Sequence, residues 1–241
     1  MTNAINDFKS NFENRFNQQS ILNLGEDSVR YDFFNAFMNS YNLQPYDIQV
    51  EFPINTNSFT PNFNPRSKRK ENPQIDLYCM HPNKIISAEF GLFKRNSNPK
   101  GQVNSSEKVF KMLNDILRLS LNKLYTPNES YFICVADSTI LGTQMNNAIL
   151  PAFPSPVYTF GYTDINNWVN TIKSAKSKFD SRFVHKANLL GLTINAKLIY
   201  NQRILNPGLP PLSITNNLET RVLVYKINEV NKKFNDESNS N

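Results

Sequence analysis

The sequence predicts an α/β fold in which helices flank a central mixed β-sheet, and two observations favour it. A long apolar helix expected over 105–125 is followed at 131–137 by YFICVAD, a continuous apolar run typical of a strand covered on both faces. Upstream, 46–54 alternates apolar and polar residues, and 73–93 holds two strand-like runs around the turn HPNK. A hairpin followed by a helix and a buried strand predicts antiparallel and parallel pairs in one sheet.

Two amphipathic helices are expected before this sheet. Apolar residues recur at helical spacing within 4–22, and Gly25 interrupts the pattern. A second helix is expected from Glu26 to Tyr41, because Glu26 and Asp27 suit the positive end of a helix and a broad apolar face follows. Both helices should lie with their apolar sides against the sheet.

The second half of the chain adds further strands and one more helix. VYTFGY at 157–162 and ETRVLVYKI at 219–227 are expected strands, as are LLGLTI and AKLIY between them. The segment 163–183 is expected to form a single helix. Because the sequence has no repeat and no shift in composition, 1–230 should form one domain, with a frayed tail over 231–241.

Composition limits the possible chemistry. The 241 residues are 39% hydrophobic, enough for a core that needs no disulfide. No stretch approaches the roughly 20 apolar residues of a membrane span, and the start is polar, so we expect a cytoplasmic protein without a membrane partner. Cys79 and Cys134 lie in strand-like runs, and together with His81 and His185 they lack the spacing of a zinc site. A metal would therefore be held by oxygen.

The charge indicates an anionic partner. A net charge of +6 and a pI near 9.2 are a mild bias towards nucleic acid. Two polar, basic segments, 55–73 and 95–104, bracket the expected hairpin, where they could contact DNA phosphates. Ordinary solvated loops are the alternative. The candidate DNA-binding residues are Arg66, Lys68, Arg69, Lys70, Arg95 and Lys100.

Two acids stand out on the expected hairpin. Asp76 and Glu89 lie on consecutive strands, each between apolar neighbours. Two buried carboxylates need a cation or a tight hydrogen-bond network, because burying them uncompensated costs several kcal/mol. Mg²⁺ would satisfy them, since it takes carboxylate oxygens as ligands. The alternative is a pair of exposed acids on a solvated sheet face.

This arrangement resembles the PD-(D/E)XK nuclease superfamily, in particular the type II restriction endonucleases. Over 26–137 the order is a helix carrying Glu26, a strand, a strand with Asp76, a strand with Glu89, a helix and a strand. The resemblance implies a restriction-endonuclease-like core in which Asp76 and Glu89 bind Mg²⁺ and Glu26 completes the metal site. The alternative for Glu26 is a first-turn acid paired with Arg30.

The family pattern also places a catalytic lysine two residues after the second acid, where this chain has Gly91. Lys94, Lys108 and Lys111 are the candidate replacements. Lys94 would point away from Glu89 unless Gly91 marks a bulge. The other two belong to a polar stripe on the expected helix, which could face the site, a second subunit or solvent. The stripe consists of Lys108, Lys111, Asp115, Arg118 and Asn122.

Taken together, the residues predict a Mg²⁺-dependent endonuclease that cleaves double-stranded DNA. We expect a homodimer, because cutting both strands needs two sites. Gly91 supports an alternative, a catalytically inactive nuclease-like protein that binds DNA or regulates a partner. A partner protein without a nucleic-acid role is the third possibility. The sequence contains no P-loop, G-x-S-x-G or H-E-x-x-H motif to favour another enzyme class.

Overall fold

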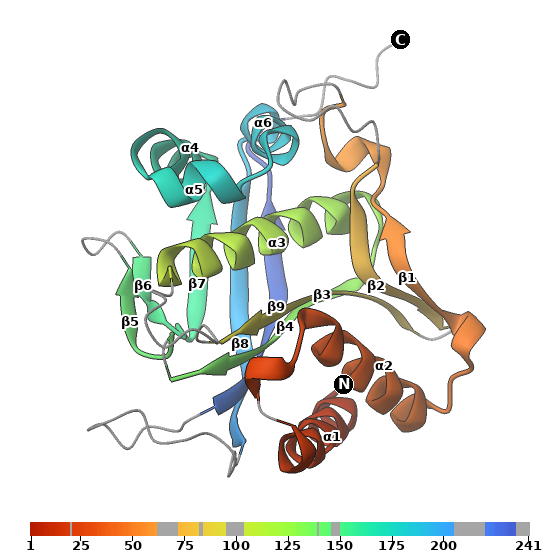
Figure 1. The fold of residues 1–241 in the computed structure, drawn as a ribbon. Coiled ribbons are helices and arrows are strands. Elements are labelled where there is room, and N and C mark those ends of the chain that lie inside the picture. Colours follow the sequence, from red (N-terminus) through yellow and green to blue (C-terminus); the bar gives the residue numbers. More distant parts are fainter. Residues whose placement is uncertain are drawn as a thin grey trace.

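A seven-stranded mixed sheet with helices on both faces forms the centre of the molecule (Figure 1). The computed structural model describes residues 1–19, 21–61, 72–81, 84–94, 104–138, 140–145, 150–204 and 220–234. The strand order is β1-β2-β3-β4-β9-β8-β7, and β5 and β6 pair separately. The strands are β1 (Ile48–Pro53), β2 (Gln74–His81), β3 (Lys84–Phe93), β4 (Glu129–Asp137), β5 (Thr143–Met145), β6 (Leu150–Phe153), β7 (Val157–Gly161), β8 (Thr193–Ile204) and β9 (Thr220–Asn231). The α/β class expected from the sequence is confirmed.

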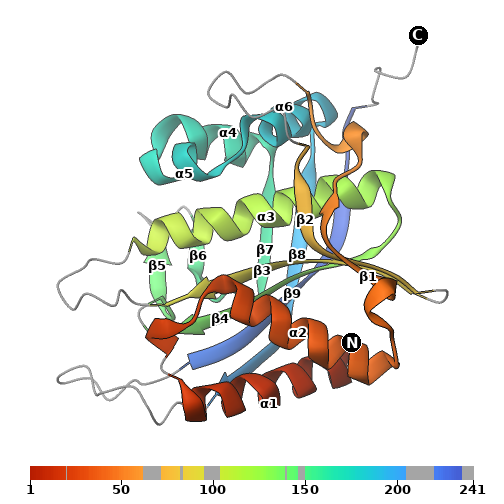
Figure 2. The same cartoon turned by 45° about the vertical axis from the view of Figure 1, so that its right-hand side comes forward.

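The helices form a layer on each face of the sheet (Figure 2). Helices α1 and α2 cover one face, whereas α3 lies across the other with α4, α5 and α6 beyond it. The bounds are α1 (Thr2–Gln18), α2 (Glu26–Tyr41), α3 (Ser105–Tyr125), α4 (Tyr162–Thr171), α5 (Lys173–Lys178) and α6 (Ser181–Leu190). Short 3-10 turns occur at Ile21–Asn23, Pro45–Asp47 and Thr56–Ser58.

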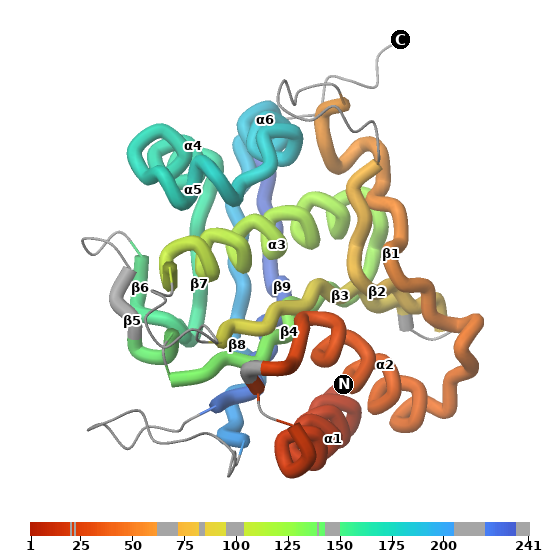
Figure 3. The backbone as a smooth tube through the Cα atoms, in the orientation of Figure 1, coloured from red at the N-terminus to blue at the C-terminus, as the bar shows by residue number. Residues whose placement is uncertain are grey.

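Strands β3 and β4 are parallel and are joined by α3, as Figure 3 traces. The other neighbouring strands of this sheet are antiparallel. A parallel pair requires a crossover, and α3 supplies it with an apolar surface wide enough to be buried on two sides. The predicted hairpin, helix and buried strand are therefore confirmed.

Alternation along β3 assigns its side chains to the two faces. Ala88, Phe90 and Leu92 join the core beneath α1 and α2. Phe93 belongs to the core beneath α3, so Glu89 lies on the α3 face as well. The position of one acid relative to the helix layers is thus fixed by the register of this strand.

One expected helix is wrong. The segment 163–183 contains α4, α5 and the start of α6 rather than a single helix. Ile172 leaves the helical conformation, with φ −117° and ψ 116°. Asp180 then caps α6, because its side chain accepts a hydrogen bond from the N–H of Arg182. The expected strands LLGLTI and AKLIY likewise form the end of α6 and one strand, β8.

The two ends of the chain also differ from expectation. The first helix, expected over 4–22, ends at Gln18. Fraying was expected from residue 231, but the backbone N–H groups of Lys233 and Phe234 bond the carbonyl of Leu190. The rest of that tail, 235–241, lies outside the described residues. Within the described chain, no helix is both long and apolar enough to cross a bilayer.

Candidate functional site

The two strand acids meet where β2 and β3 separate. In the described part of these strands, backbone pairing ends at Leu77 opposite Ala88. Beyond this pair, Oδ2 of Asp76 accepts a hydrogen bond from the backbone N–H of Phe90 at 2.9 Å. The Asp76 side chain therefore replaces a backbone partner and lies beside Glu89 of the neighbouring strand.

The helix layers supply cations to this gap from both faces. Arg30 of α2 donates from Nη2 to Oδ1 of Asp76 at 2.9 Å. Lys111 of α3 donates from Nζ to Oε2 of Glu26, the first residue of α2, at 2.5 Å. Glu26 therefore pairs with Lys111 and not with Arg30, contrary to the simpler expectation for a first-turn acid.

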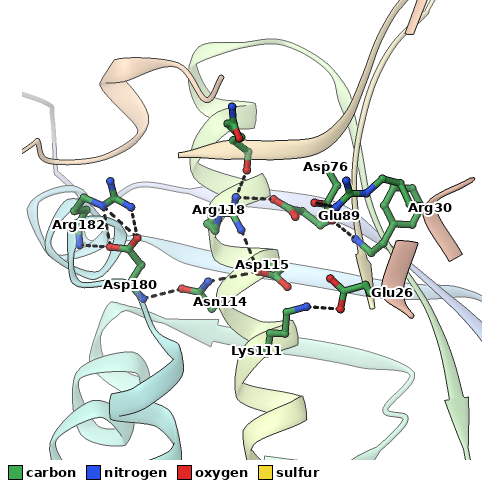
Figure 4. A network of polar contacts seen from close by, with 12 residues as sticks. Glu26, Arg30, Asp76, Glu89, Lys111, Asn114, Asp115, Arg118, Asp180 and Arg182 are labelled. Carbon is green, nitrogen blue, oxygen red and sulfur yellow. Dashed lines mark hydrogen bonds and ion pairs between the residues drawn. The ribbon is translucent and has the colours of Figure 1, made fainter. Parts of the chain in front are cut away.

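Arg118 of α3 contacts two further carboxylates (Figure 4). Its Nη2 lies 3.1 Å from Oε1 of Glu89, and its Nη1 lies 3.3 Å from Oδ1 of Asp115. Nη2 also donates a hydrogen bond to the carbonyl of Gln74, and its contact with the buried Oε1 of Glu89 is an ion pair without the geometry of a hydrogen bond. Arg118 thus offsets the charges of two buried carboxylates at once.

Burial sets the protonation of the two innermost acids. Glu89 and Asp115 are 2% and 3% exposed. Desolvation raises the pKa of Glu89 well above its usual value, against the opposing effect of Arg118 and with a further increase from Asp76. Desolvation likewise raises the pKa of Asp115 to about 6, although Arg118 and Lys111 lower it. Groups with such shifts are typical of functional sites.

The cations of the site keep their charge. Burial alone would lower the pKa of Lys111, but the carboxylates of Asp115 and Glu26 outweigh it, and the pKa is raised. For Arg118, burial would lower the pKa, but the nearby charges of Glu89 and Asp115 outweigh it, and the pKa is raised as well. Lys111 is therefore an ammonium ion at neutral pH, suited to contact an anion and not to remove a proton.

Asp115 makes the stability of the protein depend on pH. Its pKa is raised from 3.8 to about 6, so the folded state binds the proton more tightly than the unfolded state does. This contribution to the free energy of unfolding is fully present below pH 4 and is lost as pH rises through about 6. On going from pH 4 to pH 8, the free energy of unfolding of Asp115→Asn should rise by roughly 2–3 kcal/mol relative to that of wild type. Urea unfolding in the presence of chelator measures this difference. An equal difference at both pH values would contradict this.

Of the three candidate lysines, Lys111 is the one that the structure pairs directly with an acid of the site. Lys94 lies on the other face of β3, where its Nζ donates to the carbonyl of Leu24 at 2.5 Å. The strand alternation therefore continues through Gly91, and the bulge that would have redirected Lys94 is absent from this described strand. Lys108 lies 3.5 Å from the carbonyl of Leu92, and burial followed by the nearby Lys111 lowers its pKa.

Packing explains why Gly91 carries no lysine. A Cβ atom built at Gly91 would lie 3.0 Å from the ring of Phe93 and 3.1 Å from the ring of Phe132. Both rings are buried beneath α3, so a side chain at this position would displace part of the core. The place of the expected lysine is thus filled by aromatic packing, and a cation can reach the acids only from another element.

The polar stripe of α3 faces this site over part of its length. Lys111, Asp115 and Arg118 meet the acids, whereas Asn122 accepts a hydrogen bond from the N–H of Asn55 through its Oδ1. The ion pair between Arg30 and Asp76 was not predicted, and no local pattern in the sequence indicates it. The predicted DNA-binding residues Arg66, Lys68, Arg69, Lys70, Arg95 and Lys100 lie outside the described residues.

The oxygen atoms of the site match the chemistry of a hard cation. The potential ligand atoms of Glu26, Asp76 and Glu89 are all carboxylate oxygens, which Mg²⁺ prefers. Oε1 of Glu89 accepts no hydrogen bond in the structure. As placed, each of these acids pairs with a basic side chain. Accordingly, among the described residues no three Asp, Glu, His or Cys side chains are gathered closely enough to hold a metal ion. The donors fit Mg²⁺ in kind, and Asp76 lies next to Glu89.

No family model, curated protein or solved structure matches this chain. The chemistry of the acids and cations between β2, β3, α2 and α3 therefore has to indicate the function.

Proposed function

We propose that this protein is a Mg²⁺-dependent deoxyribonuclease, a type II restriction-like endonuclease that hydrolyses phosphodiester bonds of double-stranded DNA. The observation that carries the proposal is that Asp76 and Glu89 lie side by side at the gap between β2 and β3, while Lys111 pairs with Glu26 close enough to interact with the charge of Asp76. These are the acids that the resemblance to PD-(D/E)XK nucleases selects, together with a lysine from the following helix.

The order of elements supports the same proposal. Helix α2, the antiparallel strands β1, β2 and β3, the crossover helix α3 and the parallel strand β4 follow one another as the resemblance implies. The acids lie at the start of α2, on β2 and on β3. Topology alone hosts many functions, so the weight rests on the acids and the lysine.

In this proposal Asp76 and Glu89 hold the metal and Glu26 supports it. When bound, Mg²⁺ would polarise the scissile phosphate and lower the pKa of a bound water. Arg30 and the N–H of Phe90 fix the Asp76 carboxylate, so that its orientation is set before substrate arrives. Lys111 carries a positive charge beside the acids and would contact a phosphate oxygen, where negative charge builds up during hydrolysis.

A cleavage assay tests the proposal. Purified protein with Mg²⁺ should cut plasmid DNA, and Asp76→Ala or Glu89→Ala should reduce the rate about a thousandfold, because each change removes a carboxylate of the metal site. Glu13→Ala is the matched control, since Glu13 lies on α1 and pairs with Lys9 there. Cutting that persists in both site variants would contradict the proposal.

Gly91 favours a second candidate, a nuclease-like protein that binds DNA or regulates a partner without cutting. Binding of duplex DNA without cleavage in Mg²⁺ or Mn²⁺ would support this candidate over the first. For the active enzyme we also propose a homodimer, because two strands require two sites, and sedimentation velocity measures this directly.

A further inference from the structure

Helix α5 has basic residues and serines around its outer side. The six residues KSAKSK include three lysines and no acid. Ala175 is fully buried, and the ring of Phe179, just after the helix, lies 6.1 Å from Phe110 and 6.2 Å from Trp168. These contacts anchor the inner side of α5 on α3 and α4. Lys173 and Lys176 are consequently left exposed to solvent.

The helical layer that contains α5 has a net positive charge. From α4 to α6, residues 162–190 contain five basic and two acidic residues, a net +3 that is half of the total +6. The other basic residues there are engaged, since Arg182 pairs with Asp180 at 2.6 Å and the buried Lys186 lies over the ring of Tyr125. The exposed excess charge of this layer therefore lies on α5.

Helix α5 is connected to the candidate site through α3. Lys178 pairs with Glu107 in the first turn of α3, with Nζ 3.3 Å from Oε2. Lys111 follows Glu107 by one helical turn, about 6 Å along the axis, and pairs with Glu26. The ribbons place α5 beside α3 on the side of the sheet that carries Glu89 (Figures 1 and 2).

We propose that Lys173 and Lys176 form a phosphate-contacting surface for double-stranded DNA whose scissile bond lies at the candidate site. This proposal rests on the proposed nuclease function. A duplex that reaches Lys111 and runs along α3 towards Glu107 would bring further phosphates to α5, because it carries one negative charge per roughly 1.7 Å of its axis. Exposed ammonium groups contact phosphates without reading bases, so this surface would position DNA of any sequence.

Salt dependence of binding tests the surface directly. Anisotropy of a labelled 30-base-pair duplex is measured in chelator between 50 and 200 mM KCl, so that no cleavage occurs. Relative to wild type, Lys173→Ala/Lys176→Ala should reduce the slope of log K against log salt by about 2, at roughly 0.9 per phosphate contact. Lys9→Ala/Lys197→Ala is the matched control, because Lys9 lies on α1 and Lys197 is exposed on β8.

The outcomes separate this inference from the proposed function. If the α5 variant keeps the wild-type slope while the protein cuts plasmid, the surface is wrong and the nuclease stands. If wild type binds with a steep slope that the α5 variant loses, but never cuts in Mg²⁺, the surface stands and catalysis does not. Absence of any salt-dependent binding, or tighter binding to duplex RNA or an acidic protein, would overturn the DNA surface.

Discussion

Replacing Lys111 by methionine is expected to lower the rate of plasmid cleavage by about 10²- to 10³-fold. The substitution keeps the length of the side chain but removes the ammonium group that lies 2.5 Å from Glu26. A cation placed where negative charge develops typically contributes this much to a reaction rate. Single-turnover cleavage at saturating Mg²⁺ measures the effect on the chemical step.

Lys94→Met is the matched control for this experiment. Lys94 is only three residues from Gly91, but it lies on the other face of β3 and bonds the carbonyl of Leu24. The cleavage rate of Lys94→Met should therefore stay within a few-fold of wild type.

Lys111→Met should leave the thermal midpoint almost unchanged, because the pair with Glu26 is more than one-third exposed. The reverse ranking of the two variants would place the catalytic lysine on β3.

Replacing Arg118 by methionine is expected to lower the free energy of unfolding by about 3–5 kcal/mol at pH 8. The change leaves the buried carboxylates of Glu89 and Asp115 without their shared guanidinium group. Removing one partner of a buried ion pair is costly, because the remaining charge stays in a low-dielectric environment. Urea unfolding followed by circular dichroism measures the difference.

Two comparisons make this stability measurement specific. Arg203→Met removes an exposed arginine of β8 and should change stability by less than about 0.5 kcal/mol. The cost of Arg118→Met should also shrink at pH 4–5, since the pKa values of both acids are raised and protonation removes their charge. Adding Glu89→Gln to Arg118→Met should restore part of the lost stability. A cost independent of pH would indicate lost packing instead.

Local patterns were sufficient to predict most helices and strands. The expected bounds Glu26–Tyr41 and Ser105–Tyr125 agree with α2 and α3, because apolar spacing and end signals coincide there. The failure at 163–183 lies at Ile172, where the helix breaks, and Phe179 beyond the break packs its ring on Phe110 of α3. Apolar periodicity continues across Ile172, so it gives no sign of the break.

The sequence indicated the acids directly and Lys111 as one of three candidate lysines, but it carried no sign of the contact between Arg30 and Asp76. Alternation and apolar neighbours identified Asp76 and Glu89 without any knowledge of distant residues. The contact of Arg30 with Asp76 joins residues 46 positions apart, and that of Lys111 with Glu26 joins residues 85 apart. Such contacts depend on how two helix layers dock on opposite faces of one sheet, which local periodicity does not encode.

The location of Lys111 on the crossover helix has a consequence for folding. A lysine two residues after Glu89 would reach the acid as soon as the hairpin formed. Here the charge arrives only when α3 has closed over β3 and β4 and α2 has docked from the opposite side, contacts of high sequence separation that carry a large loop-closure entropy. In the proposed nuclease, the charge that completes the site would therefore be present only once the native topology is complete. A partly folded chain would hold the acids without Lys111, so a nuclease built in this way would leave nucleic acid intact until folding is complete.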